Sequence, residues 1–213
     1  FLSTGSVETG PGGLLDNDID ADGDVLTVSL VSGPAHAASF TLNPDGSFTY
    51  VHDGSETTAD SFVYRVSDGS LTDTATVSLS ITPVNDNNPV ITSNGGGATA
   101  SINVAENATA VTTVTATDAD LPAQTLTYSI SGGADAAKFT INSTNGTLTF
   151  VTAPNFEIPT DVGTNNVYNV TVRVTDGTFA DTQAIAVTVT AVNDNTPVIT
   201  SNGGGATDRK SVV

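Results

Sequence analysis

Residues 168–175 read YNVTVRVT, in which apolar side chains alternate with polar ones at a period of two. Residues 77–82 read VSLSIT and follow the same alternation. A period of two is typical of a half-buried β-strand, because successive side chains of a strand point to opposite faces. No segment of the chain has a comparable helical period. These segments therefore predict a protein built from β-strands.

Turn signals separate the predicted strands at matching places. Pro44-Asp45-Gly46 and Thr144-Asn145-Gly146 each lie between two alternating runs. Asp-Gly and Asn-Gly favour tight hairpins because these residues tolerate positive φ. Short strands, regular turns and many β-branched residues indicate antiparallel sandwiches. The predicted fold class is all-β, with two tandem Greek-key, immunoglobulin-like antiparallel β-sandwiches of about seven strands each.

The chain of 213 residues contains a long internal repeat. Residues 84–99 recur at residues 192–207 with one change, Asn88 to Thr196. The two copies start 108 residues apart, which corresponds to one whole domain per repeat. We predict a first repeat over residues 1–84, a linker over 85–89, a second repeat over 90–192, and over 193–213 a second linker with the start of a truncated third repeat. Residues 208–213 depart from the repeat and are interpreted as a terminal tail of cloning origin.

Composition excludes several classes of function. The 23 acidic residues outnumber the 5 basic ones, for a formal charge of −18, which repels nucleic acid and anionic membrane surfaces and attracts cations. The chain has no Cys, which excludes disulfides and thiolate metal sites. It has neither an apolar run of 18 or more residues nor a signal peptide, so we expect no direct membrane insertion of this stretch.

The second repeat resembles a cadherin repeat through five short motifs that occur in that family's order. They are Ala105-Glu106-Asn107, Asp118-Ala119-Asp120, Asn155-Phe156-Glu157, Thr175-Asp176-Gly177 and Val192-Asn193-Asp194-Asn195. Two positions depart from the family pattern. Asn155 replaces an acidic ligand, and Ala191, like Pro83 in the first copy, replaces the Asp that opens the linker motif. We therefore expect a lower calcium affinity than the family pattern implies.

The first repeat is similar to the bacterial cadherin-like repeats of long surface proteins, through residues 14–24 and 60–69. Glu8 precedes Asp20 by 12 residues, and Glu106 precedes Asp118 by the same interval. The matching intervals predict equivalent roles for the two glutamates.

These resemblances imply calcium as the cofactor, held at the junctions between domains. Calcium takes six to eight oxygen ligands, so one loop cannot supply a site. For the junction within this chain, the resemblance assigns Glu8, Glu56, Asn85, Asp86, Asn87, Asp118, Asp120 and Asp176. Two half-sites would face neighbouring repeats and bind weakly alone: Asp20, Asp22 and Asp68 upstream, and Glu106, Glu157, Asn193, Asp194 and Asn195 downstream. For any single residue, a solvated turn remains the alternative, because Asp and Asn favour turns by themselves.

Two other sites are rejected. Residues 18–23 match the opening of an EF-hand loop, but the twelfth position is Ser29, where that loop requires Glu. The only histidines, His36 and His52, are expected to be exposed, and no serine lies in a G-x-S-x-G motif. We therefore expect no enzymatic activity.

Three functions remain open. The first is calcium-dependent adhesion by a rigid repeat array, with neighbouring repeats, identical molecules or cell-surface glycans as partners. The second is a passive, calcium-stiffened extender stalk. The third is a carbohydrate-binding accessory module, which ranks last because the chain has no Trp and only 6% aromatic residues. Because calcium at these sites needs extracellular concentrations, we expect an extracellular, cell-surface location and a membrane-associated parent protein.

Overall fold

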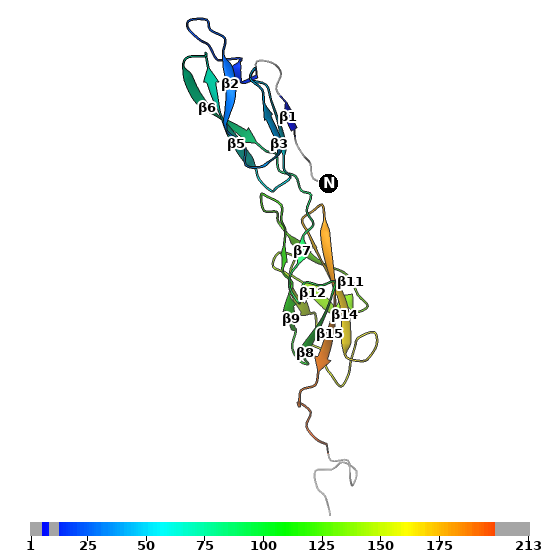
Figure 1. Ribbon diagram of the computed structural model, residues 1–213. Helices are drawn as coiled ribbons and strands as arrows, with labels where there is room; N and C mark the ends of the chain where they lie inside the picture. Colours follow the sequence, from blue (N-terminus) through cyan, green and yellow to red (C-terminus); the bar gives the residue numbers. More distant parts are fainter. Residues whose placement is uncertain (1–5, 9–12, 199–213) are drawn as a thin grey trace, which may run out of the picture. The chain divides into compact units, whose positions relative to one another are not determined.

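The computed structural model describes residues 6–8, as backbone, and residues 13–198. The strands of the first repeat are β1 (Ser6–Glu8), β2 (Thr27–Ser32), β3 (Ala37–Leu42), β4 (Phe48–His52), β5 (Ala59–Ser67) and β6 (Thr72–Ser80) (Figure 1). The strands that follow are β7 (Val90–Ile91), β8 (Thr99–Ala105), β9 (Ala110–Thr113), β10 (Ala116–Thr117), β11 (Thr127–Gly132), β12 (Phe139–Ile141), β13 (Thr147–Phe150), β14 (Val167–Thr175) and β15 (Ala180–Thr190).

Helical structure in the described part of the chain is limited to two short 3-10 turns. They are η1 (Gly13–Leu15) and η2 (Ala136–Lys138). Over these same described residues, no helix has the length and apolar character that crossing a membrane would require. The all-β prediction is confirmed.

The described residues form two compact units. Unit 1 runs to residue 92 and also includes residues 115–127 and 174–181. Unit 2 consists of residues 93–114, 128–173 and 182–198. Unit 1 therefore contains, besides the first repeat and the linker, loops that the sequence assigns to the second repeat. The domain boundaries drawn from the 108-residue repeat stay a prediction.

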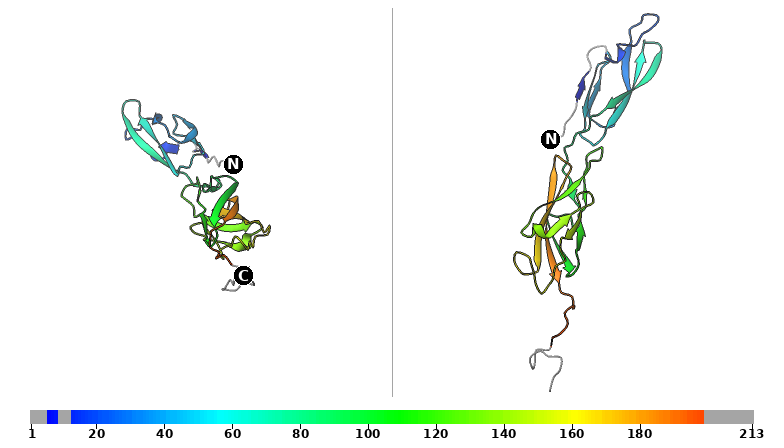
Figure 2. Two further views of the ribbon diagram at one scale, coloured as in Figure 1. Left: turned by 90° about the horizontal axis from the view of Figure 1, so that it is seen from below. Right: turned by 180° about the vertical axis from the view of Figure 1, so that it is seen from behind.

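The first repeat is a sandwich of two three-stranded sheets. Their strand orders are β1-β4-β3 and β2-β5-β6, and the front and back views show the two sheets as separate layers (Figures 1 and 2). Strands β5 and β6 pair without a bulge from Ala59, opposite Ser80, to Ser67, opposite Thr72. Each sheet turns one face to the other, and the apolar core lies between them.

The core of this sandwich is aromatic. Phe62 of β5 is 1% exposed, and its ring centroid lies 4.7 Å from that of Phe40 and 5.1 Å from that of Phe48. Tyr50 and Tyr64 complete the buried aromatic group. Burial of several aromatic side chains supplies a small domain without disulfides with its main stabilising contribution.

The second repeat has sheets with strand orders β11-β14-β15-β8 and β12-β13-β9. Along β14 the apolar side chains Tyr168, Val170, Val172 and Val174 are all at most 1% exposed, which confirms the alternation read from the sequence. One pairing is parallel rather than antiparallel: β15 pairs with β8 from Ala184, opposite Thr99, to Thr190, opposite Ala105. This pairing covers the outer edge of β15, and the alternation of side chains cannot reveal its direction.

Both predicted hairpin turns are present. Gly46 lies between β3 and β4 with φ of 86°, and Gly146 lies between β12 and β13 with φ of 72°. Ser29, which stands at the twelfth position of the rejected EF-hand match, lies in strand β2, where an EF-hand would need a helix.

The expectation of two exposed histidines is wrong for His52. This residue is 5% exposed, because alternate side chains of β4, from Phe48 through Tyr50 to His52, face the interior. Its Nε2 lies 3.0 Å from the hydroxyl of Thr57, which satisfies the buried ring nitrogen.

The turn at Gly146 generates a stability prediction. A Cβ at this position would overlap the carbonyl oxygen of Val114, whereas a Cβ at Gly95, also at positive φ, would meet nothing within 4 Å. We expect Gly95→Ala to lower the free energy of unfolding of unit 2 by about 1 kcal/mol, from backbone strain alone. Gly146→Ala should cost more than twice as much, because strain and steric overlap add. Urea denaturation of the two variants measures the difference, and equal costs would contradict the overlap.

Candidate metal centre

The structure gathers predicted acidic residues into three groups, each with carboxylate oxygens within 4.8 Å of one another. They are Glu56 with Asp86 and Asp120, Asp118 with Asp120 and Asp176, and Glu106 with Glu157 and Asp194. The first two groups share Asp120 and lie in unit 1, and the third lies in unit 2. The sequence predicts every member of these groups as a metal ligand.

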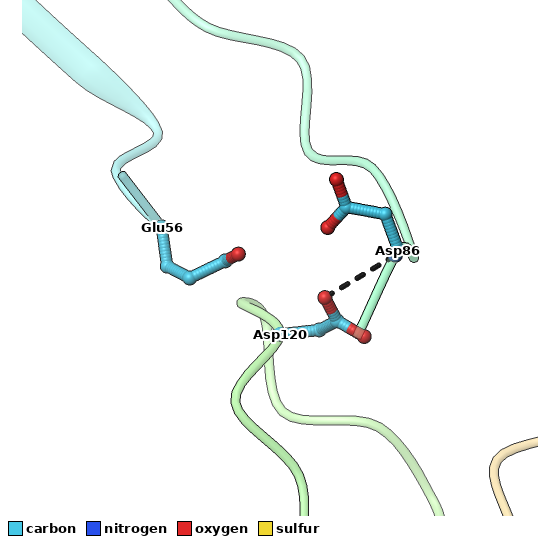
Figure 3. Close-up of side chains that lie close together, drawn as sticks. All are labelled: Glu56, Asp86 and Asp120. Carbon is cyan, nitrogen blue, oxygen red and sulfur yellow. Dashed lines mark hydrogen bonds between the residues drawn. The ribbon is translucent and has the colours of Figure 1, made fainter. Parts of the chain in front are cut away.

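The first group joins segments that are far apart in the chain. Glu56 comes from the loop between β4 and β5, Asp86 from the linker, and Asp120 from the loop after β10. Their carboxylates point toward one another (Figure 3). A hollow of about 40 Å³ is lined by Glu56, Asp86 and Leu121, among others.

Asp120 is the centre of the hydrogen bonds in unit 1 and is 1% exposed. Its Oδ1 accepts from the side-chain Nδ2 of Asn87 at 2.8 Å and from the backbone N–H groups of Asn87 and Asp86 at 3.2 and 3.4 Å. Burial alone would raise the pKa of Asp120. These hydrogen bonds outweigh burial and hold the pKa below its ordinary value, so the carboxylate stays charged.

Glu56 holds the linker through the same asparagine. Its Oε1 accepts from Nδ2 of Asn87 at 2.8 Å, and its Oε2 accepts from the backbone N–H of Leu121 at 3.3 Å. Asn87 therefore bridges Glu56 and Asp120, which explains why this linker position carries an amide with two donor hydrogens.

The second group presents oxygens that lack a hydrogen-bond partner. Asp118 uses Oδ1 to accept from the backbone N–H of Asp120 at 3.1 Å, and Asp176 uses Oδ1 for the N–H groups of Thr178 and Phe179 at 2.6 and 2.7 Å. The remaining oxygens, Oδ2 of Asp118 and Oδ2 of Asp176, are buried without a partner among the described residues, as is Oδ1 of Asn85.

These orphaned atoms test the fit of a metal ion. Among the described residues only four buried side-chain oxygen or nitrogen atoms lack a partner, and three of them belong to this site. A buried acceptor without a partner costs about 1–3 kcal/mol, so their concentration at one place indicates an absent positive group. All the candidate metal-ligand atoms are carboxylate or amide oxygens, which are the ligands that a hard cation such as calcium prefers.

Asp176 stays ionised for the same reason as Asp120. Burial raises its pKa, but the backbone N–H groups of Thr178 and Phe179 outweigh burial and lower the pKa below the ordinary value. Asp68, which lies 108 residues earlier, repeats the geometry, since its Oδ1 accepts from the N–H groups of Ser70 and Leu71. The short turn thus fixes the carboxylate locally in both repeats.

The downstream group in unit 2 centres on Glu106, which is 3% exposed. Its Oε2 accepts from the N–H of Phe156 at 2.8 Å and its Oε1 from the N–H of Val192 at 2.7 Å. These two bonds lower the pKa of Glu106 below its ordinary value of 4.5. Asp194 accepts from Nδ2 of Asn107 at 2.6 Å.

Two other predicted members accompany this downstream group. Asn195 donates from Nδ2 to Asp194 at 2.8 Å, and Asn193 lies exposed in the same segment. Glu106, Glu157 and Asp194 are therefore brought together. Among the described residues, no side-chain hydrogen bond ties Asn193 to this group.

The upstream residues are not assembled to the same degree. Asp20 accepts from the backbone N–H of Asp22 at 2.8 Å, as Asp118 does from Asp120. Asp20 and Asp68 line one hollow, which does not include Asp22. Within the described ranges, these three residues form no group with three converging carboxylates.

The position of Glu8 differs from that of Glu106. The backbone of Glu8 pairs with Thr49, three residues after the Gly46 turn, and the corresponding Thr149 pairs with Ala110. The backbone of Glu8 therefore occupies the place of Ala110 and not that of Glu106. Its side chain lies outside the described residues, so its role as a ligand stays a prediction.

The sequence missed two contributors. Gln124 bonds to both Asn85 and Asp120, and nothing in the type or spacing of this residue indicates it. Asn107 lies in the motif Ala105-Glu106-Asn107 and donates to Asp194, and its place next to Glu106 is the signal that could have indicated this contact.

These features define a class of protein: tandem β-sandwiches whose loops collect acidic oxygen ligands at several places. The bacterial cadherin-like domain family matches residues 2–83, and the cadherin domain family matches residues 100–192. The chain is therefore built from tandem repeats of the cadherin type. Cadherin domains in general serve calcium-dependent adhesion and are non-enzymatic.

Relatives of known sequence belong to the same family. The chain is similar to Protocadherin Fat 1 of Homo sapiens, with 35% identity over 136 residues, covering 62% of this chain and 3% of that protein. It is also similar to Cadherin EGF LAG seven-pass G-type receptor 2 of Mus musculus, with 32% identity over 194 residues, covering 87% of this chain and 6% of that protein. The chain thus spans a small part of these relatives.

Solved structures agree on the fold. The extracellular domain of Protocadherin GammaB4 matches with a TM-score of 0.62 and 23% identity, over 83% of this chain and 29% of that one. Mouse Cadherin-23 EC22-24 matches with a TM-score of 0.58 and 24% identity, over 87% of this chain and 62% of that one.

The lowered pKa of Glu106 predicts a pH-dependent stability. A depressed carboxyl pKa stabilises the folded state above the ordinary value of 4.5, and this contribution is lost as the pH falls through the folded pKa. In chelator at pH 7, Glu106→Gln should melt a few degrees below the wild type. The gap should close as the pH is lowered from 4.5 toward 2.

The matched control for this experiment is Asp16→Asn, which removes one exposed carboxylate. Thermal melting followed by circular dichroism measures both variants. A gap between Glu106→Gln and the wild type that is independent of pH would contradict the assigned hydrogen bonds.

Proposed function

We propose that this chain binds calcium and mediates calcium-dependent adhesion as part of a rigidified repeat array. The observation that carries the proposal is the set of three buried oxygens, on Asn85, Asp118 and Asp176, that have no hydrogen-bond partner in the described chain. Membership of the cadherin family supports the same metal.

The residues proposed to hold calcium in unit 1 are Glu56, Asn85, Asp86, Asn87, Asp118, Asp120 and Asp176, with Glu8 as a further candidate. Glu106, Glu157, Asn193, Asp194 and Asn195 form the proposed downstream half-site, and Asp20, Asp22 and Asp68 the upstream one. When bound, calcium supplies positive charge and accepts oxygen ligands from several segments at once. Asn87, which bridges Glu56 and Asp120, keeps two of these segments at binding distance.

The proposed consequence is rigidity. Without a cation, the carboxylates of unit 1 repel one another, and the linker is held by a few hydrogen bonds. Extracellular modules bind calcium with a Kd of roughly 10⁻⁴ to 10⁻³ M, so millimolar calcium adds about 0.4 to 1.4 kcal/mol per site. Binding in this affinity range requires millimolar calcium, so we propose an extracellular, cell-surface location for the parent protein.

The ligand assignment is tested by Asp118→Ala combined with Asp120→Ala. We expect this double variant to lose the calcium-binding heat of unit 1 and the calcium-induced rise in melting temperature. Both sandwiches should remain folded in chelator, because their cores lie in other residues. Isothermal titration calorimetry gives the binding heat and circular dichroism gives the fold.

The matched control is Asp20→Ala combined with Asp22→Ala, which removes the same Asp-Ala-Asp motif where three carboxylates do not converge. Its binding heat should stay close to that of the wild type. Unchanged binding by the Asp118 and Asp120 double variant would overturn the assignment.

Adhesion and a passive stalk differ in one measurable respect. Beads coated with this chain should aggregate in millimolar calcium and disperse in chelator if the repeats themselves contact identical molecules. Beads coated with the Asp118→Ala, Asp120→Ala double variant are the control and should stay dispersed. Absence of aggregation by the wild type in both conditions would reject direct homophilic contact by these repeats and favour the extender stalk.

A carbohydrate-binding module has the least support. Such modules present exposed aromatic platforms, but none of the exposed large apolar side chains of the described residues is aromatic. Phe62 and Tyr64, which the sequence pattern assigned to the core, are 1% and 8% exposed.

A further inference from the structure

We propose that Gln124 is a positioning residue that sets which end of the Asn85 side chain faces the metal. This inference rests on the proposed calcium site of unit 1, and it concerns a residue that is not itself assigned as a side-chain ligand. It follows from a chain of hydrogen bonds in which donors and acceptors have a fixed order.

The chain begins at Asp120. A carboxylate oxygen accepts hydrogen bonds, and Oδ1 of Asp120 already accepts them from Asn87 and Asp86. Its Oδ2 lies 3.4 Å from Nε2 of Gln124, so the donor end of the Gln124 amide faces Asp120. The carbonyl end of Gln124 is thereby left for another partner.

That partner is the linker residue Asn85. Oε1 of Gln124 accepts from Nδ2 of Asn85 at 2.7 Å, a short bond within which only the NH₂ end of Asn85 can face Gln124. The other end of the same amide, Oδ1, is therefore directed away from Gln124. This is one of the three buried oxygens that lack a partner in the described chain.

The order of donors decides whether Asn85 can serve a cation. An asparagine amide has an oxygen and a nitrogen of nearly equal size, and only the oxygen is a ligand for calcium. With Gln124 in place, rotation of the Asn85 amide by half a turn would put two carbonyl oxygens against each other. Gln124 thus holds the nitrogen end of the Asn85 amide and leaves its oxygen buried and without a partner, before any ion arrives.

Orienting groups behind metal ligands typically change affinity by about 10- to 100-fold when removed. Gln124→Met retains an unbranched side chain of similar length but removes both amide interactions. We expect this variant to bind calcium about 10-fold more weakly in calorimetry, with a melting temperature in chelator close to that of the wild type. Thr125→Val, at an exposed position of the same loop, is the matched control and should bind like the wild type.

A double-mutant cycle separates positioning from a general effect on the loop. If Gln124 acts through Asn85, Gln124→Met should have little further effect on calcium affinity in an Asn85→Ala background. Equal losses in both backgrounds, or an undiminished affinity of Gln124→Met, would overturn the proposal.

A second readout does not require calcium. In the calcium-free protein, the side-chain NH₂ protons of Asn85 should exchange slowly in the wild type and quickly in Gln124→Met, as measured by nuclear magnetic resonance. Fast exchange in the wild type would reject the hydrogen-bond relay even if calcium binds. Slow exchange in a wild type that releases no heat with calcium would keep the relay and reject the proposed function.

Discussion

Negative charge without a matching positive group is the constraint on which unit 1 depends. Glu56, Asp86, Asp118, Asp120 and Asp176 converge on two overlapping sites. In the described part of the chain, the ion pairs within 4 Å join histidines to Asp53, and none of these five carboxylates is paired with Lys or Arg. Like charges at such distances repel, and burial of Asp120 strengthens the repulsion because the local dielectric is low. A bound multivalent cation would remove this repulsion, and it would also provide the partner that three buried oxygens lack.

Hydrogen bonds from the Asn87 side chain and from backbone N–H groups explain how Asp120 and Asp176 remain charged without that cation. Asp120 and Asp176 accept several hydrogen bonds, and these lower the carboxyl pKa despite burial. In Asp118 and Asp176, one oxygen accepts hydrogen bonds from the turn and the other is buried without a partner among the described residues. At Asp176 the turn therefore does two things: it builds the loop and it keeps the carboxylate ionised. This arrangement accounts for the clustering of Asp in turns, where the residue would be favoured even without a metal.

Asn85 and Gln124 add a constraint on the orientation of a side-chain amide, which a carboxylate does not need. Both oxygens of a carboxylate are ligands, but an amide must be turned the right way. Asp120 accepts from the NH₂ group of Gln124, and the carbonyl oxygen of Gln124 accepts from the NH₂ group of Asn85, so one proposed ligand sets the amide orientation of another. The tertiary fold thus provides an order of donors and acceptors in addition to the ligands themselves.

How much could be read from the sequence differs between levels of structure. Strand β14, the turns at Gly46 and Gly146, and the all-β class follow from local periodicity and local backbone preference, and the structure confirms them. The grouping of Glu56, Asp86 and Asp120 was predicted only from the order of the motifs, because that order indicates the family and therefore its fold.

Interactions between distant segments were beyond the sequence. The parallel pairing of β15 with β8, the burial of His52 and the contacts of Gln124 depend on which segments meet in three dimensions. The residue types involved, an amide, an imidazole and alternating small side chains, have the same local pattern whether they are exposed or paired. The sequence by itself determined the strands, the turns and the supply of oxygen ligands, because these depend on near neighbours and on composition. Only the tertiary structure decided which oxygens converge and which remain without a partner, because burial and partner choice arise when loops 30 to 90 residues apart are brought together.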